Sequence, residues 1–304
     1  MPRRASAESR RRVRVFVQCI GPGVGLPRLQ AAFAGEARRE IACLLASLRN
    51  AYLRTASYTT TEIRWQRAGA AWAIDYTRPD ARVENGARAI LAVRDLASGY
   101  RLLELPAQGD DAATTVAALE ALFLEHGAPL VLKSDNGGHF IDEEVRALLE
   151  RWRVLHLLSP VRSPAYNGSI ESAIGWSKES VAYIAERNGH ADLWTAADIE
   201  EARCVANDTL RPRGVTGPTP AEAWRAGVPI EDGERNALRA RAAAIEGELL
   251  ASGVARSSAK AESARQRKAR RDATRRAADE YGILTVGRRR IRLTKRLLMR
   301  ARIP

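Results

Sequence analysis

Apolar positions near the amino terminus recur with a helical period. Residues 27–33 and 36–54 each have a helical composition, and Ala34 and Gly35 interrupt the pattern between them. In the second segment the recurring apolar residues fall on one face of the expected helix: Ile41, Leu44, Leu45 and Leu48. This pair of segments predicts a short helix-turn-helix element, which is either a DNA-reading unit or a plain helical hairpin.

From Trp72 onward the period of the pattern becomes that of strands. Residues 72–74, 89–93 and 101–105 are short apolar or β-prone runs, and Ser98 and Gly99 form a turn signal between the last two. We therefore expect three antiparallel strands in this part of the chain.

Beyond residue 110, helical and strand patterns alternate. The expected elements are a helix at 111–126, a strand at 130–133, a helix at 142–152, a strand at 154–158, a Pro- and Gly-containing loop at 159–168, and a helix beginning near Ser169. Strands first, then alternating helices and strands, is the order of an α/β, RNase H-like mixed sheet flanked by helices.

The carboxy-terminal part is rich in Ala and Arg. Residues 234–280 contain no proline and few large apolar residues, so this segment should be helical but poorly able to fold alone. Residues 283–286 and 290–293, separated by Gly287 and two arginines, predict a basic β-hairpin. We expect three regions: a helical amino-terminal region at 1–66, a core at 67–230, and a basic arm with the hairpin at 231–304.

Charge is distributed unevenly among these regions. The chain carries a net charge of +13, with 12 basic and 4 acidic residues in 1–66, 17 and 23 in 67–230, and 20 and 9 in 231–304. Basic ends around an acidic middle indicate ends that hold a polyanion and a middle that holds cations or performs chemistry. The simpler alternative is that the basic ends only aid solubility or bind nucleic acid loosely.

Several classes of protein are disfavoured by composition. No apolar stretch approaches the roughly 18 residues of a membrane span, and the Arg-rich start lacks the apolar segment of a secretory signal, so we expect a soluble intracellular protein without membrane contact. The three cysteines are scattered and the four histidines are isolated, so the sequence predicts neither disulfides nor a zinc site.

Three acidic residues lie at the ends of expected strands or at the start of an expected helix, where a purely structural pattern does not call for them. Asp75 ends the first expected strand, Asp135 follows the strand at 130–133, and Glu171 opens the helix after Gly168. A carboxylate at a strand end is costly to desolvate unless it is paired or bound to a cation. Each acid alone has an ordinary explanation as a turn or first-turn residue. Their joint spacing, 59 and then 35 intervening residues, makes a stronger case for a shared function.

The chain resembles the Asp-Asp-Glu transposases and retroviral-type integrases, whose last two carboxylates are commonly 35 residues apart. Residues 72–77 (WAIDYT) are similar to the family's first strand, and residues 134–140 (SDNGGHF) to its second aspartate turn. Residues 159–171 correspond to the loop before the glutamate, although 161–166 and the two residues after Glu171 differ from the usual sequence. Arg211 and Pro212, followed by residues 219–224 (TPAEAW), are similar to the ending of many bacterial insertion-sequence enzymes.

The resemblance implies that Asp75, Asp135 and Glu171 are catalytic residues that bind metal. Displacement at a DNA phosphorus needs an activated oxygen and compensation of the charge on the leaving oxygen, and two Mg²⁺ ions roughly 3.5 to 4 Å apart can serve both. Oxygen ligands suit Mg²⁺, for which Mn²⁺ is a possible substitute. We expect Asp75 to bridge both ions, and Asp135 and Glu171 to bind one each.

Two further residues are candidates for DNA binding. Lys178 lies seven residues after Glu171, about two helical turns, and therefore on the same face. In the resembling families a basic residue at this spacing touches the terminal DNA, whereas the alternative is a solvated surface lysine. Asn136 either approaches the scissile strand or orients the turn that carries Asp135.

The expected function is that of a transposase or integrase that cleaves DNA ends and transfers the strands. Its partners would be transposon ends and target DNA, and the protein would form a homo-oligomer on DNA in the nucleoid of a bacterial cytoplasm. Two alternatives remain: a catalytically silent, transposase-derived DNA-binding protein, and an RNase H-type nuclease that only hydrolyses. The acidic triad disfavours the first, and the 35-residue spacing with basic ends disfavours the second.

Overall fold

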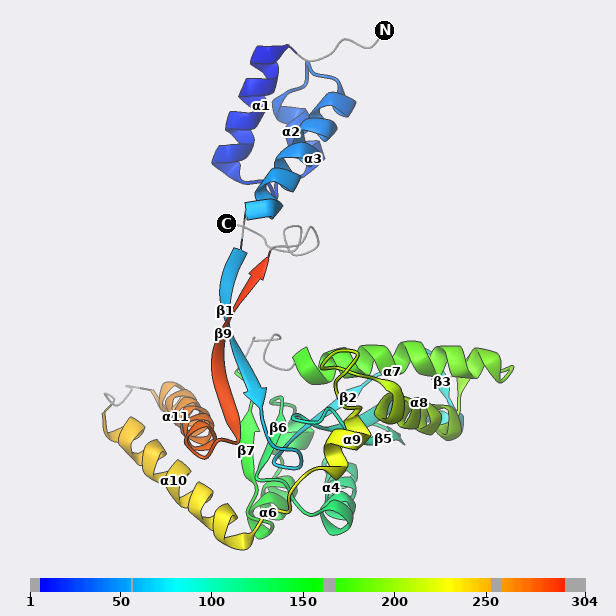
Figure 1. The fold of residues 1–304 in the computed structure, drawn as a ribbon, viewed down its shortest axis with the longest axis vertical. Coiled ribbons are helices and arrows are strands. Elements are labelled where there is room, and N and C mark those ends of the chain that lie inside the picture. Colours follow the sequence, from blue (N-terminus) through cyan, green and yellow to red (C-terminus); the bar gives the residue numbers. More distant parts are fainter. Residues whose placement is uncertain (1–5, 56, 161–167, 253–257, 293–304) are drawn as a thin grey trace. The chain divides into compact units, whose positions relative to one another are not determined.

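The computed structural model describes residues 6–55, 57–160, 168–252 and 258–292 (Figure 1). The chain divides into two compact units, one formed by residues 1–62 with 286–304 and the other by residues 63–285. Within the described ranges, no helix has both the length and the apolar character needed to cross a membrane. Residues 161–167 of the expected loop before Glu171, including its unusual sequence, lie outside the described residues.

The smaller unit contains three helices: α1 (Ala7–Ile20), α2 (Leu26–Ala32) and α3 (Arg38–Thr55). The two helices expected from the sequence are α2 and α3, whereas α1 was not expected. Its signal is weak because only Val13 and Val17, four positions apart, are buried in a helix rich in exposed arginines. They pack with Leu29, Ile41 and Leu45 in one small apolar cluster.

Strands β1 (Ser57–Trp65) and β9 (Leu284–Arg292) form a two-stranded sheet. The prediction of a hairpin between residues 283–286 and 290–293 was therefore wrong for the described residues up to 292. Gly287, the expected turn residue, is not among the glycines with positive φ, so the strand continues through it. The hydrogen-bonding partner of β9 is a distant strand, which a local turn signal cannot reveal.

A five-stranded mixed sheet lies at the centre of the larger unit. Its strands are β2 (Ala71–Thr77), β4 (Ala89–Asp95), β5 (Arg101–Ala107), β6 (Val131–Ser134) and β7 (Leu155–Leu158), in the order β5-β4-β2-β6-β7. Strand β4 is antiparallel to both β2 and β5, whereas β6 and β7 continue the sheet parallel to β2. The expected three antiparallel strands and the mixed sheet are thus confirmed.

One face of the sheet is covered by α4 (Ala112–His126), the short α5 (Gly138–Ile141) and α6 (Glu143–Arg151). Successive strand residues point to opposite faces. Trp72, Ile74, Leu91 and Val93 accordingly share this face and pack with Phe123 in the main apolar core. Asp111 caps α4 by accepting a hydrogen bond from the Thr114 amide at 2.7 Å.

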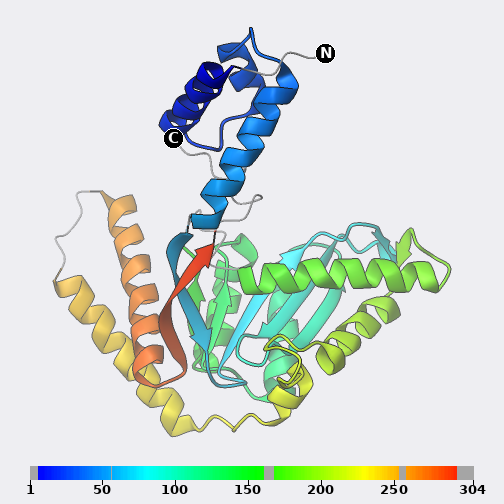
Figure 2. The same cartoon turned by 45° about the horizontal axis from the view of Figure 1, so that its top comes forward.

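The opposite face is covered by two separate helix pairs (Figure 2). Helices α7 (Gly168–Arg187) and α8 (Ala196–Thr209) pack with Ile90 of β4, near the short strands β3 (Arg82–Val83) and β8 (Leu193–Trp194). A 3₁₀ turn, Glu84–Gly86, follows β3. Helices α10 (Asp232–Ala251) and α11 (Ala259–Glu280) pack with Val131 and Leu157 of β6 and β7. The middle of this face, along β2 and β6, lies between the two apolar clusters.

The second helix pair corresponds to the basic arm expected from the sequence. Its helical character is confirmed, but Leu238, Ile245 and Ala273 are buried against the sheet within the larger unit. This packing explains how a segment with few large apolar residues is stabilised. The division into functional regions at 66/67 and 230/231 stays a prediction.

Candidate active site at the carboxyl ends of β2 and β6

The register of the sheet places polar residues on the face between the two helix pairs. Ala73 is opposite Arg94 on one side and Lys133 on the other, so these three residues share a face. Asp75 and Asp135 lie two residues further along their parallel strands, and the two-residue period returns them to the same face. The sheet topology therefore brings the first two acidic residues of the predicted triad together.

The turn after β6 is held by hydrogen bonds around Asp135. The carboxylate of Asp135 accepts one from the Gly137 amide at 2.8 Å, and the Asn136 side-chain amide donates to the Ser159 carbonyl at 2.7 Å. A side chain at Gly137 would place its Cβ 2.6 Å from the ring of His139. Asn136 thus ties the Asp135 turn to the end of β7, which is the orienting role proposed from the sequence. Its approach to DNA stays a prediction.

Glu171 lies in the first turn of α7, on an exposed side of the helix. Arg94 links this turn to the sheet because its guanidinium donates to the Ser169 carbonyl at 2.8 Å and to the Gly99 carbonyl at 3.1 Å. Gly99 has a φ of +80°, and a Cβ at that position would lie 2.8 Å from the Arg94 guanidinium. The β4–β5 turn and the start of α7 are therefore built around one arginine.

The negative charges of Asp135 and Glu171 act on Asp75. Burial raises the pKa of Asp75 to about 6, and repulsion by Asp135 and, more weakly, by Glu171 adds to the shift. Burial also lowers the pKa of Lys133 to about 8, against the attraction of Glu171. The site is thus a partly desolvated group of carboxylates beside a buried lysine, which the sequence analysis did not identify. The signal was present, because Lys133 is a charged residue inside an otherwise apolar strand.

The donor chemistry of this group fits a hard divalent cation. Among the described residues, no three His, Cys, Asp or Glu side chains lie close enough together to hold a metal ion. Asp75, Asp135 and Glu171 nevertheless supply only oxygen atoms, the ligands that Mg²⁺ prefers. A divalent cation would offset the repulsion that raises the pKa of Asp75.

Lys178 lies further along α7 and makes an ion pair. Its ammonium is 2.7 Å from the Asp80 carboxylate, and 22% of its side chain is exposed. Lys178 also lines a small apolar cavity with Thr77 and Ile174. These contacts differ from those of a freely solvated lysine, whereas the predicted contact with terminal DNA is still a prediction.

A buried ionic cluster fixes α7 to the sheet further from the acids. The Arg101 guanidinium lies 3.2 Å from Glu104, and the Ser177 hydroxyl donates to the same carboxylate at 2.6 Å. Arg101 also lies 4.6 Å from the centre of the Trp176 ring, so this tryptophan is held by a cation. Trp72 and Trp194 are fully buried.

The segment that follows α8 also has a structural role. Thr219 and Glu222 form a reciprocal capping box at the start of α9 (Pro220–Arg225), and Arg211 lies 3.6 Å from Glu222. Trp224 on this helix stacks on Tyr100 with ring centres 5.2 Å apart. The threonine, proline, glutamate and arginine of this motif therefore anchor a short helix rather than contribute to the acidic site.

Comparisons with known proteins agree with this architecture. Residues 66–164 match the family model described as "Integrase core domain". The chain is similar to the catalytic core of BIV integrase, at 20% identity and a TM-score of 0.42 over 52% of this chain and 95% of that one. It is also similar to the HTLV-2 integrase catalytic core in complex with magnesium, at 18% identity and a TM-score of 0.43 over 53% and 99%.

A larger match is with a chain of the simian T-cell lymphotropic virus intasome in complex with PP2A regulatory subunit B56 gamma. There the identity is 16% and the TM-score 0.50, over 70% of this chain and 78% of that one. No protein of curated function matches the chain by sequence. The matched segment contains β2, β4, β5, β6 and β7 with Asp75 and Asp135, so this part of the chain is similar to an integrase core domain and has an RNase H-like fold.

Proposed function

We propose that this protein is a polynucleotidyl transferase that cleaves DNA at the ends of a mobile element and joins those ends to target DNA. The observation that carries the proposal is the placement of Asp75 and Asp135 by the parallel strands β2 and β6, with Glu171 near enough to add to the raised pKa of Asp75. Structural cores rarely place acidic side chains together without a compensating cation or a function.

The three carboxylates would hold divalent cations, with Mg²⁺ as the physiological ion, Mn²⁺ as a substitute, and two ions in the complete site. When bound, such ions supply charge compensation at the phosphate and activation of the attacking oxygen. The remaining residues position these groups: Arg94 holds the turn before Glu171, and Asn136 holds the turn of Asp135. Lys178 would bind the phosphate backbone of the terminal DNA.

The proposed partners are the element ends, a target DNA and further copies of the chain. The similarity to a chain of an intasome supports an assembly on DNA, since joining two ends to one target requires both ends to be held together. We place this activity in a bacterial cytoplasm, with the protein associated with the nucleoid.

A strand-transfer assay with purified protein, labelled element ends and plasmid target tests the proposal. We expect Asp75→Asn, Asp135→Asn and Glu171→Gln each to lower cleavage and joining at least 100-fold, because each amide keeps the shape but loses the charge that binds a cation. Glu186→Gln is the matched control, since Glu186 is exposed on the same helix as Glu171.

The assay also separates the alternatives. Cleavage without joining would identify a hydrolytic nuclease, and DNA binding with neither reaction would identify a silent DNA-binding protein. Near-normal strand transfer by one of the three variants would remove that residue from the catalytic group.

A further inference from the structure

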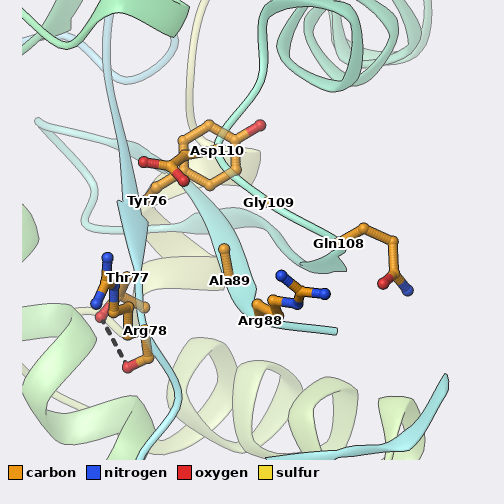
Figure 3. Close-up of a pocket in the computed structure, with 8 residues that line it drawn as sticks. All are labelled: Tyr76, Thr77, Arg78, Arg88, Ala89, Gln108, Gly109 and Asp110. Carbon is orange, nitrogen blue, oxygen red and sulfur yellow. Dashed lines mark hydrogen bonds between the residues drawn. The ribbon is translucent and has the colours of Figure 1, made fainter. Parts of the chain in front are cut away.

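A broad hollow borders the end of the strand that carries Asp75. It has a volume of about 490 Å³, and its walls include Thr77, Arg78, Arg88 and Gln108 (Figure 3). Thr77 lies two residues after Asp75 at the end of β2, and Ala89 at the start of β4 lines the hollow as well. The hollow thus adjoins β2 two residues beyond Asp75.

A second hollow continues from the first. Its volume is about 720 Å³, it shares Arg78 and Arg88 with the first hollow, and it adds Arg82 of β3. Three arginines therefore line one continuous depression, which we call the arginine groove (Arg78, Arg82 and Arg88). All three side chains are exposed.

The arginines of the groove differ in their contacts from other arginines of the larger unit. None of its three guanidinium groups forms an ion pair or side-chain hydrogen bond with another described residue, whereas Arg151, Arg187 and Arg203 of the same unit each pair with a glutamate. Asp80, an acidic residue in the wall of the second hollow, is paired with Lys178 at 2.7 Å. Asp110 and Asp192 also line the hollows, so acidic side chains are present but do not meet the arginines.

The walls of the groove favour a chain of phosphates over a compact apolar ligand. Guanidinium groups bind phosphate oxygens through paired hydrogen bonds, and three of them along one depression match the repeating charge of a nucleic-acid backbone. The Gln108 side-chain amide donates a hydrogen bond to the Asn85 carbonyl at 2.8 Å, and it places polar atoms in one wall of the groove.

We propose that the arginine groove binds the sugar-phosphate backbone of the DNA strand that enters the site at Asp75. This inference rests on the proposed function, because it assigns to the same site the path of its substrate. A strand bound to Arg88 and Arg78 would pass Thr77, which lines the hollow and lies two residues after Asp75 on β2. The ion pair of Asp80 with Lys178 then borders the path. Lys178 is therefore held beside the strand before DNA binds.

The test is equilibrium binding of a 30-base-pair duplex without divalent cation, measured over a series of salt concentrations. Each phosphate contact contributes about 0.9 to the slope of log affinity against log salt, so Arg78→Ala or Arg88→Ala should lower the slope by about 0.9 and weaken binding roughly eightfold at 0.1 M salt. The double variant should lower the slope by about 1.8. Arg225→Ala is the matched control, because Arg225 is also exposed and has no ion pair with another described residue.

Two results would overturn the inference: an unchanged slope in the Arg78→Ala, Arg88→Ala double variant, or an equal loss in Arg225→Ala. If the alanine variants unfold, Arg78→Gln with Arg88→Gln preserves side-chain bulk and should give the same decrease in slope. A wild-type protein that binds DNA through these arginines but neither cleaves nor joins would contradict the proposed function and leave the groove intact. An active wild type whose double variant binds normally would contradict the groove alone.

Discussion

Arg94 is a partly buried cation whose guanidinium donates to backbone carbonyls. Burial lowers the pKa of its guanidinium to about 10, and its two described side-chain hydrogen bonds go to Gly99 and Ser169. Lysine keeps the charge but cannot present the same planar set of donors. We expect Arg94→Lys to lose one of these bonds, to destabilise the fold by about 1 to 2 kcal/mol, and to lower the strand-transfer rate about tenfold by misplacing the turn before Glu171.

The informative measurement is the Mg²⁺ concentration at half-maximal rate, together with thermal unfolding. A positioning role predicts that this concentration rises in Arg94→Lys, because Glu171 would meet the ion less well. If the unfolding temperature changes but the Mg²⁺ concentration at half-maximal rate does not, Arg94 stabilises the fold without positioning Glu171. Arg225→Lys provides the surface control.

His156 makes stability depend on pH. Its Nε2 lies 2.8 Å from the Ser134 hydroxyl, and burial, with nearby Arg146 and Arg270, lowers its pKa from 6.5 to about 4. The unfolded chain therefore takes up a proton first as the pH falls, so stability decreases between about pH 6.5 and pH 4 and is unaffected above that window. The loss from this group is at most about 3 to 4 kcal/mol, at 1.4 kcal/mol per unit of pKa.

Denaturant unfolding at pH 7.5 and pH 5 measures this effect. The variant His156→Gln removes the titrating group, so its stability should change less between the two pH values than that of the wild type. An identical pH dependence in the two proteins would assign the effect to other groups.

At the level of single residues, strand position made Asp75 and Asp135 predictable, but their neighbours were not. Asp75 lies near the end of β2 and Asp135 directly follows β6, and the apolar residues of both strands are visible in the sequence. Arg94 and Lys133 lie beside Ala73 only because of the register between three strands. Such a register depends on pairing across the sheet, which a single sequence does not specify.

At the level of elements, α9 is a short helix that depends on its cap. Thr219 accepts from the Glu222 amide at 3.2 Å, and Glu222 in turn accepts from the Thr219 amide at 2.8 Å. We expect Thr219→Ala to reduce the free energy of unfolding by about 1 kcal/mol. Denaturant unfolding gives this value, with Thr209→Ala as control because its exposed hydroxyl bonds only to the Val205 carbonyl of its own helix. An equal decrease in the free energy of unfolding in both variants would mean that the cap does not stabilise α9 specifically.

The element predictions succeeded where periodicity was local. Strands β2, β4 and β5 and helices α4 and α6 were expected because each has a repeating apolar face. The hairpin failed because β9 pairs with β1, more than 200 residues away in the sequence. The helix α1 was missed because its few buried valines are outnumbered by arginines.

At the scale of the whole molecule, the basic carboxy-terminal helices are part of the fold, so deleting them would not isolate any contact that they make with DNA. Several of their cations are used within the protein: Arg235 donates to the Ala128 and Pro129 carbonyls, and Arg241 pairs with Glu280. Leu238 and Ile245 of α10 are buried against the sheet. Removing residues 231–304 would therefore expose the core, and weakened DNA binding would follow from unfolding as well as from lost charge.

Substitution of individual cations separates these two causes of weakened binding. Arg267 and Lys268 of α11 are exposed and have no carboxylate partner among the described residues. If α11 contributes to non-specific DNA affinity, Arg267→Ala with Lys268→Ala should lower the slope of log affinity against log salt by about 1.8, two phosphate contacts, without changing the unfolding temperature. Leu238→Ala should do the reverse, destabilising the fold by about 2 to 5 kcal/mol while the folded fraction retains the wild-type slope. A wild-type slope in the double alanine variant would mean that the positive charge of α11 does not contact DNA.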